Sequence, residues 1–178
     1  YGKVFESTNN KGYVVKSIYL GAISTWTREI LIGQLINSKY VIKISAVQKT
    51  RNYVMLYMRQ YEPLRKFINR VKKSKNRSAF SKICLEIAYK VLIGISDMHR
   101  MGVCHRDLKV DNILIDYDEY GNLRPVICDL GMAGCNFDKI IIKSNVVTTE
   151  THRAPEIQLE NDPGNYYSMD CDIWAFAV

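Results

Sequence analysis

The eight residues His105-Arg106-Asp107-Leu108-Lys109-Val110-Asp111-Asn112 decide how this sequence is interpreted. They satisfy every specified position of the pattern H-R-D-L-x-x-x-N, which is expected between a helix and a short strand. The stretch brings a carboxylate, an ammonium group and a side-chain amide together on one short loop. Such groups can accept a proton, stabilise developing negative charge and provide an oxygen ligand for a metal ion.

The residues on both sides of this loop have the required pattern. Apolar side chains recur every three to four residues over 78–100 and Gly102 follows, which predicts a long helix buried on one face. Pro63 can start a shorter helix over residues 64–71. Beyond the loop we expect strands at 112–116 and 125–129, a loop-like segment over 130–153 and a helix from 169 to 178.

The first third of the chain has the pattern of β structure interrupted by one helix. The turn residues Asn9-Asn10-Lys11-Gly12 predict a hairpin between strands at 1–7 and 13–20. Apolar positions at helical spacing predict a helix over 24–37, with Ser24 or Thr25 as its N-cap. Two further strands are expected at 41–47 and 53–58.

With these elements in this order, the chain resembles the catalytic domain of eukaryotic-type protein kinases of the serine/threonine type. The resemblance covers the whole chain, and Leu130 stands where the family usually has Phe. Besides the catalytic loop, the matching segments in family order are Tyr1-Gly2-Lys3-Val4, Val14-Val15-Lys16, Glu29, Asp129-Leu130-Gly131 and Ala154-Pro155-Glu156.

The resemblance implies an α+β, two-lobed fold. A small, mostly antiparallel β N-lobe with one helix would cover residues 1–58 without its first strand, and a hinge would cover 59–62. A mainly helical, partial C-lobe would cover 63–178 and end inside the helix after the activation segment. The domain is then truncated at both ends. We expect the 178-residue piece alone to be poorly stable and weakly active, whereas its parent is an active kinase.

The resemblance also implies a role for each catalytic residue. Asp107 accepts or orients the proton of the attacking hydroxyl, and Lys109 contacts the transferred phosphate. A lysine at this position indicates serine/threonine rather than tyrosine specificity. Asn112 completes the catalytic set and, together with Asp129, holds Mg²⁺ through hard oxygen ligands.

ATP and Mg²⁺ are the implied cofactors. Lys16 would contact the α- and β-phosphates, and Glu29 would hold Lys16 in place through an ion pair. Tyr57 is expected at the gatekeeper position, the residue at the back of the nucleotide pocket. The remaining residues of the implied ATP site are Gly2 near the phosphates, Val4 and Val14 above the adenine, Leu114 below it, and Met58 and Gln60 in the hinge.

Three segments resemble the branch of cyclin-dependent and mitogen-activated kinases: Thr27-Arg28-Glu29-Ile30, His152-Arg153-Ala154-Pro155-Glu156 and Asp172-Ile173-Trp174. This resemblance implies an activation segment that ends at Glu156, with Ser144 at the phosphorylated position. Thr148 and Thr149 are rival sites, although Thr149 is better interpreted as a partner of the catalytic loop. Arg28 and Arg106 would clamp the phosphate, whereas Gly134 replaces the third arginine of that clamp. A protein substrate and a cyclin-like activator are the implied partners.

Composition and spacing exclude several other classes of protein. The chain is 47% hydrophobic and 24% charged, which is typical of a globular domain. Its 25 Lys+Arg against 18 Asp+Glu give a net charge of +7, but no basic groove interleaved with aromatic residues is apparent, so no nucleic-acid partner is expected. No apolar run approaches the ~20 residues that span a bilayer, so no membrane segment is expected. The five cysteines lack the spacing of a disulfide framework, which favours an intracellular location, cytoplasmic or nuclear.

Two other functions remain open from the sequence alone. A pseudokinase would bind nucleotide as a scaffold without transfer, in keeping with Leu130 and the truncation. The second is a small-molecule kinase of related fold, and Lys109 and the Ala154-Pro155-Glu156 segment argue against it.

The remaining reactive residues are given structural interpretations. His99 and His152 are interpreted as structural, and His105 is expected to pack beneath the catalytic loop. Cys128 is interpreted as a small apolar residue beside the nucleotide pocket, where it could also be a target for a covalent ligand.

Overall fold

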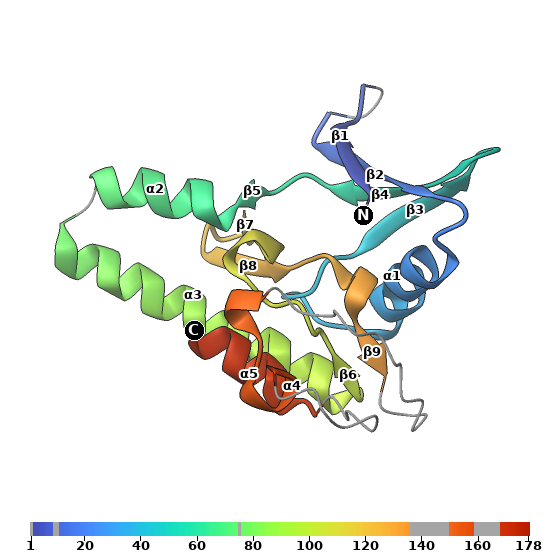
Figure 1. Ribbon diagram of the computed structural model, residues 1–178. Helices are drawn as coiled ribbons and strands as arrows, with labels where there is room; N and C mark the ends of the chain where they lie inside the picture. Colours follow the sequence, from blue (N-terminus) through green and yellow to red (C-terminus); the bar gives the residue numbers. More distant parts are fainter. Residues whose placement is uncertain (1, 9–10, 75, 136–149, 159–167) are drawn as a thin grey trace.

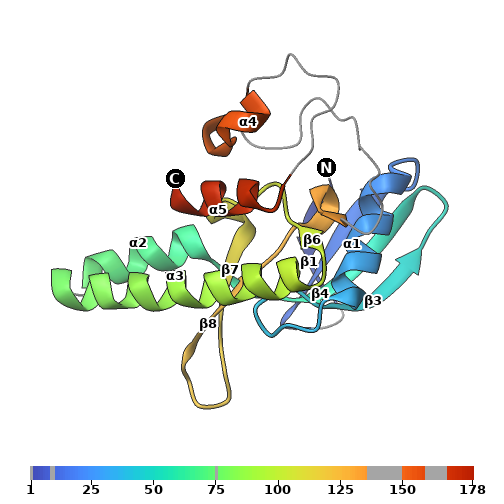
Figure 2. The same cartoon turned by 90° about the horizontal axis from the view of Figure 1, so that it is seen from below.

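The computed structural model describes residues 2–8, 11–74, 76–135, 150–158 and 168–178. The chain has an α+β fold in two parts, a four-stranded sheet with one helix and a mainly helical part (Figure 1). This confirms the predicted two-lobed fold class. The principal helices are α1 (Ile23–Leu35) beside the sheet and α2 (Leu64–Ser74), α3 (Arg77–Arg100) and α5 (Asp170–Ala177) in the helical part (Figures 1 and 2).

The sheet of the first part is antiparallel throughout. Its strand order is β1 (Lys3–Glu6), β2 (Tyr13–Tyr19), β4 (Tyr53–Arg59), β3 (Ile44–Lys49). The buried side chains Ile18, Val54 and Leu56 form its core, and Trp26 of α1 packs against them. Lys16 on β2 is paired with Leu56 on β4, so both side chains lie on the same face of the sheet.

Two predictions for this part were wrong in detail. Ser24 and Thr25 do not cap α1, because the helix begins at Ile23 and both residues lie in its first turn, after Ala22. The predicted strand at 41–47 is divided: residues from Ile44 onward join the sheet, whereas Tyr40 and Ile42 exchange backbone hydrogen bonds of 2.8 Å each with Ile127 of the other part. A run of apolar residues predicts an extended backbone but does not identify its partner strand.

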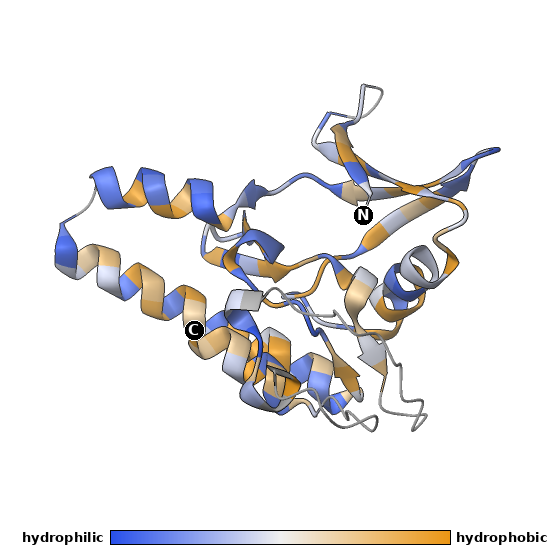
Figure 3. Ribbon diagram, viewed as in Figure 1, coloured by the Kyte–Doolittle hydropathy of each residue, from blue (hydrophilic) through white to orange (hydrophobic). Residues whose placement is uncertain are grey.

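The helical part is built around α3, whose buried face includes Ile87, Val91, Ile95 and Met98. Asn76 caps this helix by accepting the N–H of Ala79 at 2.8 Å. Figure 3 shows hydrophobic and hydrophilic residues alternating along α2 and α3, as expected for helices buried on one face. The apolar stripe over 78–100 therefore predicted α3 correctly, to within one residue at its start.

Short strands position the loops between the two parts. The remaining elements are β5 (Glu62–Pro63), β7 (Ile113–Tyr117) and β8 (Leu123–Ile127) in one sheet, β6 (Val103–Cys104) paired with β9 (Gly134–Cys135), the 3₁₀ turns η1 (Val110–Asn112), η2 (Leu130–Met132) and η3 (Glu150–His152), and α4 (Pro155–Gln158). The pairing of β6 with β9 was not predicted, since 130–153 was expected to be loop-like. It brings the segment after Asp129 beside the start of the catalytic loop.

Candidate active site

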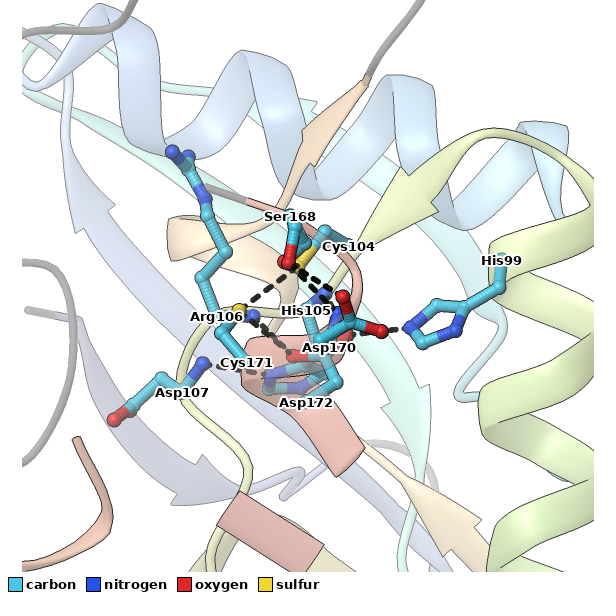
Figure 4. Close-up of polar contacts among 9 residues, drawn as sticks. All are labelled: His99, Cys104, His105, Arg106, Asp107, Ser168, Asp170, Cys171 and Asp172. Carbon is cyan, nitrogen blue, oxygen red and sulfur yellow. Dashed lines mark hydrogen bonds and ion pairs between the residues drawn. The ribbon is translucent and has the colours of Figure 1, made fainter. Parts of the chain in front are cut away.

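A buried carboxylate on α5 holds the start of the catalytic loop. Asp172 accepts the backbone N–H of His105 at 2.8 Å and that of Arg106 at 2.9 Å, and His99 Nε2 lies 2.9 Å from the same carboxylate (Figure 4). Burial acts to raise the pKa of Asp172, but the hydrogen bonds from His99 and the loop, together with the nearby His105, outweigh it and lower that pKa. Asp172 is therefore an ionised anchor for this loop.

His105 connects the catalytic loop to the segment that carries Asp129. Its side chain is fully buried, and its Nδ1 accepts the backbone N–H of Asp107 at 3.2 Å. The ring proton is then on Nε2, which donates to the carbonyl oxygen of Cys128 at 2.9 Å. The predicted role of His105, packing and hydrogen bonding beneath the loop, agrees with this geometry.

Three predicted catalytic side chains meet at Asp107. Lys109 Nζ donates to Asp107 Oδ2 at 2.8 Å, and Asn112 Nδ2 donates to the same oxygen at 3.0 Å. Asn112 Nδ2 also donates to the backbone carbonyl of Asp107 at 2.8 Å. These bonds fix the orientation of the Asp107 carboxylate and keep a cation beside it.

A second charged group joins β2, α1 and the residue after β8. Lys16 Nζ donates to Glu29 Oε1 and, at 2.8 Å, to Asp129 Oδ1. Burial opposes the charge of Lys16, but the two carboxylates outweigh it and raise the pKa of Lys16. Burial likewise opposes ionisation of Asp129, yet the charge of Lys16 lowers the pKa of Asp129. Burial dominates at Glu29 and raises the pKa of its carboxyl group.

Lys16, Glu29 and Asp129 of the second group and Asn112 of the first line one cavity of about 770 Å³ between the sheet and the helical part. A volume of this size is within the usual ~300–1,000 Å³ of a small-molecule site. The wall is more apolar than polar, and its charged and polar residues include Lys16, Asn112 and Asp129. All eight residues expected to bind ATP line this cavity: Gly2, Val4, Val14, Lys16, Glu29, Met58, Gln60 and Leu114.

Two residues of the cavity wall can provide oxygen ligands for a magnesium ion. Both hydrogen bonds described for the Asn112 side chain use Nδ2, which leaves its amide oxygen to act as a ligand. The Asp129 carboxylate is 35% exposed and lines the same cavity. An amide oxygen and an ionised carboxylate are hard ligands of the kind that Mg²⁺ prefers. The residues present therefore fit a Mg²⁺ ion bound together with phosphate oxygens.

Two expectations about the nucleotide pocket are corrected. Tyr57 lies on the opposite face of β4, where its hydroxyl donates to Gln48 Oε1 at 2.7 Å, and Leu56 lines the back of the cavity instead. Adjacent residues of a strand face opposite ways, so an error of one position reverses the side chain. Cys128 does line the cavity, but burial raises its pKa to about 12, which disfavours the reactive thiolate.

Most of the residues predicted for the activation segment are not among those that the structure describes. Ser144, Thr148 and Thr149 lie outside the described residues, and for Glu156 only the backbone, in α4, is described. Arg28 lies on α1 and Arg106 in the catalytic loop, where the Arg106 guanidinium donates to backbone carbonyls. The sequence reasoning missed Asp172 as a site residue, although Asp172-Ile173-Trp174 had been noted as a family signature.

The sequence comparisons agree with this geometry. The family description "Protein kinase domain" matches residues 1–178. A serine/threonine-protein kinase of Drosophila melanogaster is 29% identical over 99% of this chain and 21% of its own length. The meiosis-specific serine/threonine-protein kinase mek1 of Schizosaccharomyces pombe is 33% identical over 53% of this chain and 22% of its own length. The chain thus spans less than a quarter of the length of these two relatives.

Within the described ranges, no helix is both long enough and apolar enough to span a membrane.

Proposed function

The chain belongs to the protein kinase family, whose domain matches residues 1–178, and we propose that it transfers the γ-phosphoryl group of ATP to a serine or threonine hydroxyl of a protein, with Mg²⁺ bound. One observation carries the proposal. Lys16, which is paired with Glu29 and Asp129, lines one cavity, and Asn112 of the same cavity wall donates a hydrogen bond to the Asp107 carboxylate, which Lys109 also contacts.

Asp107 is the proposed acceptor of the substrate proton. The hydroxyl oxygen forms a bond to the γ-phosphorus, the bond from that phosphorus to the bridging oxygen breaks, and ADP leaves with the electron pair. The hydroxyl proton passes to the Asp107 carboxylate. The bonds from Lys109 and Asn112 hold this carboxylate in one orientation, which restricts the geometries in which the hydroxyl can approach.

The cationic groups of the site stabilise the charge that develops on the phosphoryl oxygens. Lys109 stands beside the proposed base, and Lys16 is held by Glu29 in the cavity where the phosphates would lie. Because both ammonium groups are fixed in advance, little reorganisation is needed during the reaction. Mg²⁺, when held by Asn112 and Asp129, neutralises charge on the phosphate oxygens.

Two observations support serine/threonine rather than tyrosine specificity. Lys109 occupies the position that indicates this class in the sequence resemblance, and it contacts Asp107 directly. The relatives described above are also named serine/threonine-protein kinases. A phospho-amino-acid analysis of a modified acceptor protein would distinguish the classes: phosphotyrosine as the main product would contradict the proposal.

The test of transfer uses labelled ATP, Mg²⁺ and a generic acceptor protein with the full-length protein and its Asp107→Asn variant. We expect transfer to fall by about 10³-fold or more in the variant, because the proton acceptor is lost while binding groups remain. Glu86→Gln, which removes one carboxylate charge from the exposed surface of α3, is the matched control and should retain transfer. No transfer by the unaltered protein, with Mg²⁺-dependent ATP binding intact, would favour the pseudokinase scaffold instead.

The finer assignment to the cyclin-dependent and mitogen-activated branch, with a cyclin-like activator, is also a proposal. It is supported by the exposed apolar side chains of α1, the helix that carries Glu29: Ile23 is 63% exposed and Leu31 is 60% exposed. A partner on this face could control the Lys16–Glu29 ion pair. If the purified full-length protein alone reaches a kcat of about 1–100 s⁻¹, the usual range of protein kinases, then no activator is required.

A further inference from the structure

Two cysteines from different elements meet beside the catalytic loop. Cys104 ends β6 and Cys171 lies in the first turn of α5, and their sulfur atoms are 3.3 Å apart (Figure 4). The two residues are 7% and 2% exposed. The proposed phosphoryl transfer uses neither thiol, so this contact is a separate chemical feature of the molecule.

The pair lies next to the anchor of the catalytic loop. Cys104 directly precedes His105, and Cys171 directly precedes Asp172 in the chain. The Asp172 carboxylate accepts the backbone N–H of His105 at 2.8 Å and that of Arg106 at 2.9 Å. A change in the distance between the two sulfur atoms therefore acts on the backbone at both ends of this anchor.

Two thiols in contact can share a metal ion or be oxidised to a disulfide. Asp172 is the acidic residue of the same cluster, but both of its carboxylate oxygens already accept backbone N–H groups. A metal ion would compete with those bonds for its third ligand. A disulfide needs no third group, and its formation requires the sulfur atoms to approach by only about 1.2 Å.

We propose that Cys104 and Cys171 form a reversible disulfide when the protein meets hydrogen peroxide, and that this bond slows phosphoryl transfer. The thiolate sulfur of one cysteine attacks a peroxide oxygen and the O–O bond breaks, giving a sulfenic acid and a hydroxide ion that takes up the thiol proton. The second sulfur attacks the sulfenic sulfur, the S–O bond breaks, and the departing hydroxide leaves as water with the proton of the second thiol. Two thiols are oxidised, and one peroxide is reduced to two water molecules.

The surroundings of the pair determine how fast each step runs. The contact with Cys171, burial and the charge of Asp172 raise the pKa of Cys104, so the thiolate that begins the reaction is scarce. The first step is therefore slow. The second step is fast because the partner sulfur is already in contact. We expect this pair to respond to sustained rather than brief exposure to peroxide, without accumulation of the sulfenic acid.

The effect on transfer follows from the place of the bond and rests on the proposed kinase function. Drawing β6 toward α5 displaces the start of the catalytic loop, and displacements of the order of 1 Å can lower rates by as much as about 10²-fold. We expect kcat to fall about tenfold or more. Neither cysteine is among the residues that line the nucleotide cavity, so the KM for ATP should stay within about twofold.

The first experiment detects the bond itself. The reduced full-length protein is incubated with about 1 mM hydrogen peroxide, denatured with N-ethylmaleimide to block the remaining thiols, and digested without reductant. Mass spectrometry should find a linked peptide pair that contains Cys104 and Cys171 and that disappears after treatment with dithiothreitol. Oxidation of exposed Cys135 verifies that the peroxide has acted. Recovery of Cys104 and Cys171 as blocked thiols at that point, or linked to other cysteines, would overturn the proposal.

The second experiment measures transfer before and after peroxide. The unaltered protein and the control Cys135→Ala should lose kcat about tenfold or more and recover it with dithiothreitol, whereas Cys171→Ala should stay within about twofold. Cys104→Ala repeats the test from the other side of the contact, and the peptide mapping needs no variant. An equal loss in Cys171→Ala, or full kcat in protein that carries the linkage, would refute control of transfer by this bond.

The two experiments separate this inference from the proposed function. A linked Cys104–Cys171 peptide in a protein that transfers no phosphate even when reduced would overturn the kinase proposal and leave the disulfide supported. Transfer that is unaffected by peroxide, with no linked peptide, would overturn the disulfide and leave the kinase proposal intact.

Discussion

The carboxylate of Asp172 accepts the backbone N–H group of His105 at 2.8 Å, across 67 positions of sequence. Through this bond, α5 determines where the catalytic loop begins. The same carboxylate binds the backbone of Arg106 and faces His99. A buried anion with three donors costs much less to bury than an isolated one, so this group stabilises the fold only while all its donors are present.

Replacing this anchor should destabilise the protein. In Asp172→Asn an NH₂ group replaces one carboxylate oxygen, so at least one backbone N–H loses its acceptor and the charge assistance disappears. We expect the free energy of unfolding to fall by about 2–4 kcal/mol. Denaturant titration of the full-length protein measures the change. Asp170→Asn, two residues earlier in α5 and exposed, is the control, and equal losses in the two variants would contradict the anchor role.

The contribution of Asp172 should also depend on pH. Hydrogen bonds hold its pKa below the ordinary value of 3.8 despite burial, so the folded state favours the ionised form. The resulting stabilisation is complete above the unfolded pKa and is lost as the pH falls through the lowered folded-state pKa. The difference in unfolding free energy between the unaltered protein and Asp172→Asn should therefore shrink only below about pH 4. A difference that stays constant down to pH 2.5 would argue against this titration.

The ion pairs of Lys16 predict a loss of catalysis when its ammonium group is removed. Lys16→Met retains much of the apolar stem but removes the cation shared by Glu29 and Asp129. We expect kcat/KM for ATP to fall by about 10²–10³-fold, the usual effect of removing one electrostatic stabiliser. Steady-state kinetics measure it, with Lys49→Met at the exposed end of β3 as the control. Activity within threefold of the unaltered protein would show that Lys16 does not act on the phosphates.

Cys128 should react slowly with thiol reagents. Burial and the neighbouring Asp129 raise its pKa to about 12, so at pH 8 only on the order of one thiol in 10⁴ is ionised. Exposed Cys135 on β9 provides the internal comparison. Timed alkylation with iodoacetamide and peptide mapping should show modification of Cys135 well before Cys128. Equal rates would restore the expectation that Cys128 is a useful target for a covalent ligand.

Local motifs predicted the chemistry of the site well because each reactive group has a characteristic neighbourhood in sequence. Lys16 and Asp129 are 113 positions apart, yet the motif around each one indicated a shared site. The stripe of α3 similarly predicted its buried face from periodicity alone. These features depend on residue type and spacing, which the chain displays directly.

The features that sequence reasoning missed depend on pairing between distant segments. Nothing local in Gly134 and Cys104 indicates the β6–β9 ladder, and nothing in Asp172 shows that it binds backbone N–H groups. The choice of Tyr57 over Leu56 failed because a shift of one residue reverses the face of a strand. Such contacts become visible only once the tertiary arrangement is known.

Two glycines in helices should respond in opposite ways to alanine. At Gly94 a Cβ would lie 3.0 Å from both Tyr40 Cβ and Ile127 Cδ1, and these neighbours cannot separate easily because their backbones share hydrogen bonds around Ile127. We expect Gly94→Ala to lower the free energy of unfolding by about 1–2 kcal/mol, since overpacking outweighs the gain in helix propensity. At Gly33 the contacts are ordinary, so Gly33→Ala should raise it by up to ~1 kcal/mol. Denaturant titrations of both variants provide the comparison. If Gly94→Ala proved as stable as Gly33→Ala, the close packing of α3 against Tyr40 and Ile127 would be contradicted.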